Sequence, residues 1–214
     1  MENLTIFSKF SKGKAKKTPE LSSTNRMVKI SVLAVIAFII MLFEVSVPLF
    51  PGFLKMDLSD VPPLLGAFAL GPMAGVVIEL IKNILHVVIR GTYTAAVGEL
   101  SNFILGAIFV FTAGSIYLIK KDKKHAIIGM LLGTTFMSIA GILTNYYMII
   151  PFYTKAMGLP LDTIIEMGTI ANPRIIDLKT MIIYGVTPFN ILKGIVISVV
   201  VSLIYKKLSS ILHN

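Results

Sequence analysis

Cysteine and tryptophan are absent from the 214 residues, and only 14% of the residues are charged. Without cysteine the chain cannot form disulfides, thiolate metal sites or a thiol nucleophile. Soluble globular domains carry about 25% charged residues. The scarcity of charge, together with 55% hydrophobic residues, therefore argues against an ordinary soluble domain. The three histidines are scattered and form no ligand pair four residues apart, so no metal site is predicted.

Enzyme motifs are also missing. The chain has no GxxxxGK[ST] phosphate-binding loop, no HExxH zinc motif and no GxSxG nucleophile motif. We therefore expect a protein without catalytic residues and without a resident cofactor, and any energised function needs a partner that hydrolyses ATP. The formal charge of +9 lies beside apolar runs, which indicates orientation in a lipid bilayer rather than nucleic-acid binding.

Long uncharged runs are what the sequence has in quantity. Several approach the roughly 20 residues that an α-helix needs to cross a bilayer. They predict an all-α integral membrane protein with helices at 28–47, 63–70, 73–90, 99–119, 126–152 and 181–205. Residues 1–27 are expected to form a basic, disordered cytoplasmic arm, and residues 28–214 a single six-helix transmembrane substrate-binding domain.

The Gly71-Pro72 pair decides the number of crossings, because it interrupts an apolar stretch at a helix-breaking step. If the chain turns there, six helices result and both termini lie on one side. That side then holds 13 lysines and arginines, in the arm, at 120–124 and at 206–207, against 5 on the other side. The positive-inside rule places the richer side in the cytoplasm. A multi-pass protein of the bacterial plasma membrane with both termini inside is predicted.

Polar side chains within the apolar runs are costly, so each needs a reason. They are Glu44, Glu79, Lys82, Asn83, Asn102, Asn145, Asn190 and Lys193. The six-helix topology gathers almost all of them in the outer half of the membrane, as a pocket open to the outside requires. Asparagines that join neighbouring helices are the competing interpretation, and an internal ion pair of Glu79 with Lys82 is as well supported as a ligand site. Lys193 has no acid within one helical turn and needs a partner from elsewhere.

Several segments together resemble a known family. They are DLSDVPPLL at 57–65, GP at 71–72, ELIKN at 79–83, GELSNF at 98–103, NYY at 145–147 and PFNILKG at 188–194. In order and spacing they look like the riboflavin-binding S component of energy-coupling factor (ECF) vitamin transporters. The resemblance covers the chain from about Met27 to its end.

The resemblance implies a six-helix fold with a vitamin pocket near the outer face. Asn145, Asn190 and Lys193 would contact the isoalloxazine ring, and the loop 54–60, with Asp57 and Leu58, would close the pocket. Glu79, Lys82 and Asn102 are carried over as further binding residues. The partners would be riboflavin, a membrane T subunit and two cytoplasmic ATPases. Ser31, Ala34 and Ala37 are the predicted docking face for the T subunit, although their spacing of three departs from the family's Ala-x-x-x-Ala pattern.

Other functions remain open from the sequence. An S component for thiamine or folate is the nearest alternative, but the pocket's polar groups suit an uncharged planar heterocycle with a polyol. A membrane enzyme would need motifs that the chain lacks. A structural membrane protein would use the buried asparagines only to join helices.

Overall fold

The computed structural model describes residues 23–212, so residues 1–22 of the predicted arm lie outside the described residues. Five helical stretches are long and apolar enough to cross a membrane: Ser23–Met41, Pro72–Arg90, Val97–Ile119, Lys123–Lys155 and Leu178–Tyr205. A sixth, shorter apolar helix spans Val61–Leu70. The predicted six-helix membrane fold is confirmed, with the second helix short, as its sequence requires.

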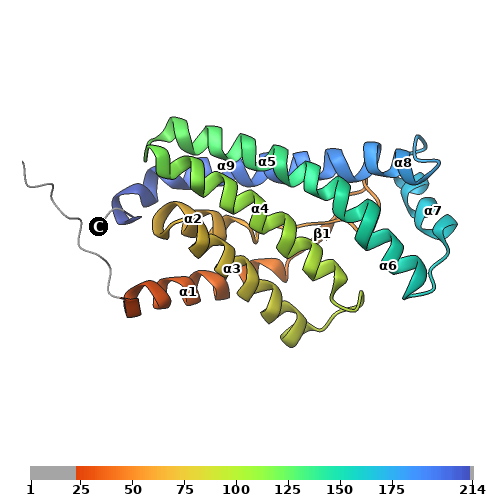
Figure 1. Cartoon of the computed structure of the whole chain (residues 1–214), viewed down its shortest axis with the longest axis horizontal. Helices are drawn as coiled ribbons and strands as arrows, with labels where there is room; N and C mark the ends of the chain where they lie inside the picture. Colours follow the sequence, from red (N-terminus) through yellow and green to blue (C-terminus); the bar gives the residue numbers. More distant parts are fainter. Residues whose placement is uncertain (1–22, 213–214) are drawn as a thin grey trace, which may run out of the picture.

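Short connections join most of the helices, and a longer connection with β1 and β2 joins α1 to α2 (Figure 1). In order they are α1 (Ser23–Met41), β1 (Val45–Ser46), β2 (Lys55–Met56), α2 (Val61–Leu70), α3 (Pro72–Leu85), η2 (His86–Arg90), α4 (Val97–Ile119), α5 (Lys123–Thr144), η3 (Asn145–Ile149), α6 (Ile150–Lys155), α7 (Leu161–Ala171), α8 (Leu178–Met181), η4 (Ile182–Val186) and α9 (Thr187–Leu212). The first helix begins at Ser23 rather than 28. It ends at Met41 rather than 47, because residues 45–46 form β1, which pairs antiparallel with β2.

The turn between α2 and α3 lies at Gly71-Pro72, as predicted. Gly71 has φ of 99°, a left-handed value that glycine adopts without steric cost. Pro72 then opens α3 at a position where its missing N–H is not needed. The two helices pack so tightly that a Cβ on Gly75 would lie 2.7 Å from the Cβ of Ala67. α2 and α3 are therefore a close helical hairpin.

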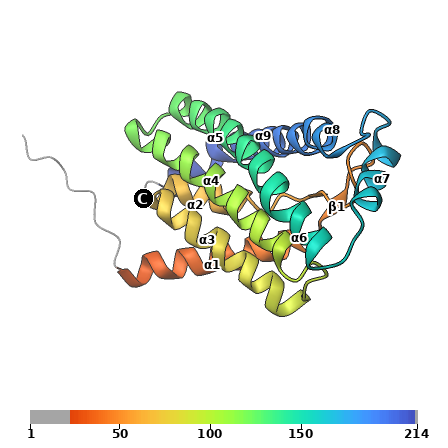
Figure 2. The same cartoon turned by 45° about the vertical axis from the view of Figure 1, so that its right-hand side comes forward.

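The helices run roughly along the long axis of the molecule and define two ends (Figures 1 and 2). The start of α1, the connection of α4 to α5 and the end of α9 lie together at one end, called here the terminal end. α6, α7 and α8 lie at the opposite loop end. Arg26 of α1 donates a hydrogen bond to the carbonyl of Leu70, which ties the end of α2 to the terminal end.

Three π-helical turns lie among the described helices: η2 ends the stretch that begins with α3, η3 joins α5 to α6, and η4 joins α8 to α9. Each inserts a wider turn and rotates the side chains that follow it relative to an ideal α-helix. Such turns are frequent at functional sites. η3 begins at the predicted ligand-binding residue Asn145, and η4 ends at Val186, one helical turn before the predicted Asn190.

The predicted docking face on α1 is mostly internal to the chain. Ala34 and Ala37 are 0% exposed and pack with Ile78 of α3 in one hydrophobic cluster. Their small side chains allow α1 to approach α3 closely, so in this conformation they offer no surface to another subunit. Only Ser31 of the predicted face is exposed.

Candidate substrate-binding site

A cavity of about 290 Å³ opens in the loop-end half of the molecule, between the helices and the loop that precedes α2. Five of the eight residues predicted to bind substrate line it: Asp57, Asn102, Asn145, Asn190 and Lys193. They come from the loop before α2, from α4, from η3 and from α9. Segments far apart in the sequence therefore converge on one space.

Asn145 and Asn190 face the cavity because α5 packs along α9. The Asn145 Nδ2 donates to the Gly141 carbonyl at 2.9 Å, and the Asn190 Nδ2 donates to the Val186 carbonyl at 2.9 Å. A backbone carbonyl only accepts, so these bonds fix which end of each amide is the donor. Within the described residues no donor reaches either Oδ1 atom, and each remains available to accept a hydrogen bond from a ligand.

The absence of a side chain at Gly141 makes room for this arrangement. A Cβ at Gly141 would lie 2.6 Å from the Asn190 Nδ2. The glycine therefore lets the Asn190 amide lie directly against α5. A substitution here would push the amide toward the cavity or out of its hydrogen bond.

Lys193 has the partners from elsewhere that the sequence required. Its Nζ lies 3.0 Å from the Asn102 Oδ1, 3.2 Å from the Asp60 Oδ2 and 3.5 Å from the Asp57 Oδ2. An ammonium group has three hydrogens to donate, and three oxygens surround this one. The Lys193 side chain is buried, so these oxygens replace the water that would otherwise solvate the charge.

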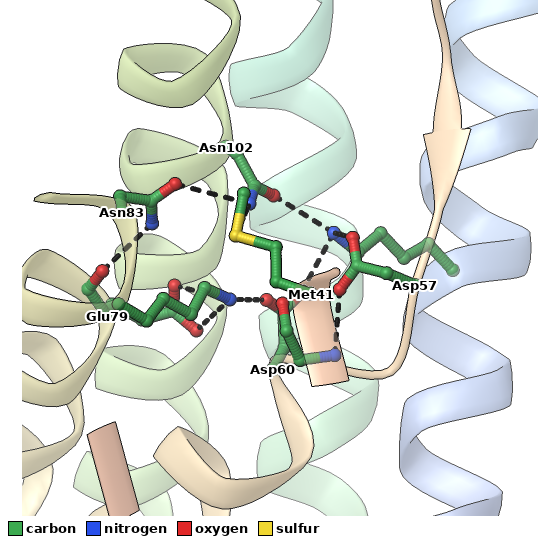
Figure 3. Close-up of polar contacts among 9 residues, drawn as sticks. Met41, Asp57, Asp60, Glu79, Asn83 and Asn102 are labelled. Atoms are coloured by element: carbon green, nitrogen blue, oxygen red, sulfur yellow. Dashed lines mark hydrogen bonds and ion pairs between the residues drawn. The ribbon is translucent and has the colours of Figure 1, made fainter. Parts of the chain in front are cut away.

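Asn102 continues the network away from the cavity (Figure 3). Its Oδ1 accepts from Lys193, and its Nδ2 donates to the Asn83 Oδ1 at 3.3 Å. Asn83 in turn donates to the backbone carbonyl of Glu79 at 2.8 Å. Because lysine can only donate, it sets the orientation of both amides in the chain. Both the oxygen and the nitrogen of the Asn102 amide are therefore hydrogen-bonded within the protein.

Glu79 and Lys82 lie behind the cavity wall rather than on it. Both are fully buried, and the Lys82 Nζ lies 2.9 Å from the Glu79 Oε2. Lys82 also pairs with Asp60. The internal ion pair is thus the arrangement observed. Neither side chain lines the cavity, and their predicted contact with substrate stays a prediction.

Leu58 also lies away from the cavity. Its side chain is 38% exposed and does not line the cavity, while its neighbour Asp57 does. The Asp57 Oδ1 accepts a hydrogen bond from the backbone N–H of Ser59 at 2.7 Å. This local turn directs the Asp57 carboxylate inward and leaves Leu58 outside.

Asp60 is a cavity residue that was not among the predicted binding residues. It is 0% exposed, lines the cavity and pairs with both membrane lysines, Lys82 and Lys193. A signal for it existed, since two lysines in apolar helices need counter-ions and an aspartate stands directly before the Pro62-Pro63 helix start.

Two further polar contacts at the cavity, one histidine–glutamate and one arginine–glutamate, also escaped prediction. The His86 Nδ1 lies 3.3 Å from the Glu99 Oε1, and the Arg90 Nη1 lies 3.1 Å from the Glu44 Oε1. All four residues line the cavity. They join the chain after α1 to η2 and to the first turn of α4, and so hold these segments around one part of the cavity wall.

Aromatic side chains supply flat apolar surface to the cavity. Phe53, Tyr153 and Phe189 line it. Phe189 also packs edge-on against Phe50, with ring centroids 5.4 Å apart. Aromatic faces of this kind stack on planar ligands.

The segment that leads into α9 is fixed at its start by a capping box. The Asp177 carboxylate accepts from the backbone N–H of Thr180 at 2.7 Å and from its hydroxyl at 2.7 Å. These hydrogen bonds hold the pKa of the Asp177 carboxyl below its usual range.

Across the described residues, no group of three or more His, Asp or Glu side chains is arranged to hold a metal ion.

Comparisons with known proteins agree with this geometry. The model of the family "ECF transporter, substrate-specific component" matches residues 25–205. The chain is 37% identical over 194 residues to the Riboflavin transporter RibU of Staphylococcus aureus (strain TCH60), covering 91% of this chain and 95% of that one. It is 37% identical over 186 residues to the Riboflavin transporter FmnP of Bacillus subtilis (strain 168), covering 86% and 91%.

A solved structure is similar over nearly the whole chain. It is described as "Structure and mechanism of the S component of a bacterial ECF transporter". The TM-score is 0.71 at 34% sequence identity, covering 90% of this chain and 100% of that one.

Proposed function

This chain belongs to the family of substrate-specific components of ECF transporters, and we propose that it captures riboflavin at the outer face of the bacterial plasma membrane. The two curated relatives described above are both riboflavin transporters. Import would then be driven by a membrane T subunit and two cytoplasmic ATPases, because the sequence has no ATP-binding motif of its own.

The observation that carries the proposal is the convergence of Asn145, Asn190 and Lys193 on one cavity with aromatic walls. Riboflavin has an imide edge with alternating acceptors and a donor, a flat apolar ring system and a chain of hydroxyls. Two amide oxygens that lack protein donors suit the imide N–H. The second hydrogen of each amide suits a carbonyl, as does the ammonium hydrogen that faces Asp57 across the longest of the three Lys193 contacts, 3.5 Å. The cavity volume of about 290 Å³ is close to the lower end of the roughly 300–1,000 Å³ found for small-molecule pockets.

Alanine substitution of the two asparagines tests this site. Asn145→Ala and Asn190→Ala each leave a polar ligand atom buried without its partner, which costs about 1–3 kcal/mol. Riboflavin affinity should therefore fall about 5- to 150-fold. Quenching of riboflavin fluorescence by purified, detergent-solubilised protein measures the affinity.

Controls separate loss of binding from loss of folding. Each variant should elute from size-exclusion chromatography like the wild type. As a specificity control, excess thiamine should not displace bound riboflavin. If both variants bind riboflavin as tightly as the wild type, the asparagines only join helices and the site assignment is wrong.

The proposed orientation places the terminal end in the cytoplasm. The start of α1, the 120–124 connection and the end of α9 share that end (Figure 1), and the excess of lysine and arginine there supports a cytoplasmic location. The cavity then opens toward the outside, where a vitamin for uptake is encountered.

Single cysteines provide a direct test of orientation, since the chain has none of its own. In intact cells, Lys155→Cys should react with a membrane-impermeant thiol reagent, whereas Lys123→Cys should react only after the membrane is permeabilised. The reverse pattern would show that the molecule is inverted.

A further inference from the structure

We propose that Asp60 is a positioning residue for substrate recognition, which acts by holding the Lys193 ammonium in its place at the cavity. The proposal rests on the riboflavin-binding function above. It concerns a residue that lies at the start of α2, outside the predicted binding set.

Asp60 is placed to act on Lys193 through one oxygen while its other oxygen is engaged. The Asp60 Oδ2 lies 3.2 Å from the Lys193 Nζ. The Asp60 Oδ1 pairs with Lys82, which also contacts Glu79 at 3.0 Å. The carboxylate therefore bridges α3 and α9, and the Lys82 side fixes where it can offer its second oxygen. In Figure 3, Asp60 lies between Glu79 and Asp57.

The remaining neighbours of Lys193 cannot replace this contact. Asp57 accepts from the Ser59 N–H through Oδ1 and has only Oδ2 left, at 3.5 Å from the Lys193 Nζ. Asn102 offers one amide oxygen without a full charge. With Asp60 neutralised, the ammonium would move toward Asp57, on the loop that borders the cavity. A buried ammonium follows its counter-ion because an unpaired charge there is costly.

The consequence is specific to ligand binding. A charge-assisted hydrogen bond from Lys193 to a ligand acceptor depends on a fixed position of the nitrogen, and such bonds are stronger than neutral ones. Asp60 should therefore contribute to affinity only while Lys193 is present. A purely structural role, as the link between α2 and α3 through Lys82, would contribute regardless of the residue at position 193.

A double-mutant cycle separates the two roles. Riboflavin affinity is measured by fluorescence quenching for the wild type, Asp60→Asn, Lys193→Met and the double variant. The same Asp60→Asn change in the Asn145→Ala background is the matched control, because Asn145 lies outside the Lys193 network. Asp60→Asn alone should weaken binding about 10-fold or more. It should weaken it less than 2-fold in the Lys193→Met background and by its full factor in the Asn145→Ala background.

The double variant also covers the case in which Asp60→Asn alone does not fold, since it removes one charge of each sign. Lys193→Met and the double variant should then bind riboflavin within 2-fold of each other. A further loss of 10-fold or more in the double variant, or an Asp60→Asn protein that binds like the wild type, would overturn the proposal. A wild-type protein that binds no riboflavin would instead overturn the proposed function itself.

Discussion

The two halves of the helix bundle differ in the polarity of their interiors. At the terminal end, Phe68, Tyr117 and Tyr205 pack against one another, and the two phenol hydroxyls meet at 2.7 Å. Phe68 and Tyr117 belong to the largest cluster of buried apolar side chains among the described residues, and Tyr205 packs against it. At the loop end, the continuation of α4 and α9 borders a cavity ringed by lysines, carboxylates and amides. One helix pair thus provides both a solid core and a polar pocket.

This difference shows how a membrane protein can keep costly groups available. Buried charges are tolerated where partners of opposite charge accompany them, and Lys82 has two such partners within the chain, Asp60 and Glu79. The asparagine oxygens at the cavity have no donor among the described residues, and a ligand would supply the missing hydrogen bonds. The apolar half holds the helices together, so the polar half can keep hydrogen-bonding groups without protein partners.

The largest expected effect follows from breaking the buried ion cluster. Lys82→Met leaves Asp60 without one counter-ion and Glu79 without its own, and removing one partner of a buried pair costs about 3–5 kcal/mol. Thermal unfolding in detergent should show a large drop in midpoint. The matched control is Lys124→Met, an exposed lysine at the terminal end, for which surface substitution costs less than about 0.5 kcal/mol. Equal midpoints for the two variants would contradict the cluster's structural role.

An intermediate effect should separate the two halves along a single helix, α5, which packs against α9 at Gly141 and against α4 at Gly129. Gly141 and Gly129 both face tight contacts of α5. A Cβ at Gly141 would lie 2.6 Å from the Asn190 Nδ2, and a Cβ at Gly129 would lie 2.7 Å from the Ala113 carbonyl oxygen. Gly141→Ala should lower riboflavin affinity about 10-fold by displacing the amide.

Gly129→Ala is the paired variant for that experiment. It should destabilise the protein by about 1–3 kcal/mol through overpacking and leave riboflavin affinity unchanged. Affinity by fluorescence quenching and thermal midpoint are measured for both variants. If Gly129→Ala weakens binding as much as Gly141→Ala does, the two halves are not separable in the way described.

The smallest effect is expected at the terminal end. Tyr205→Phe leaves the buried Tyr117 hydroxyl without its partner and should cost about 1 kcal/mol of stability, with no change in riboflavin affinity. Adding Tyr117→Phe should recover most of the loss, because replacing both partners removes the unsatisfied group. Thermal unfolding of the single and double variants tests this. A double variant less stable than Tyr205→Phe would show that the hydroxyls contribute through other contacts.

Local features of the sequence determined the class of fold and much of the site. Helix existence depends on runs of apolar residues that a bilayer requires, so the helices and the turn at Gly71-Pro72 were predictable. Lys193 could be singled out because a lone charge in an apolar helix demands a partner. Asn145 and Asn190 could be proposed from the resemblance together with the topology.

Only the tertiary structure decided which residues meet. A helix turns by about 100° per residue, so a small difference in its rotation or a π-turn moves a side chain from cavity to core. That is why Glu79 and Lys82 proved to lie behind the wall and Leu58 outside it. Asp60 became the common partner of two lysines on different helices, and the Ala34 face closed against α3. Each of these outcomes depends on contacts between segments distant in sequence, whose relative placement no local pattern encodes.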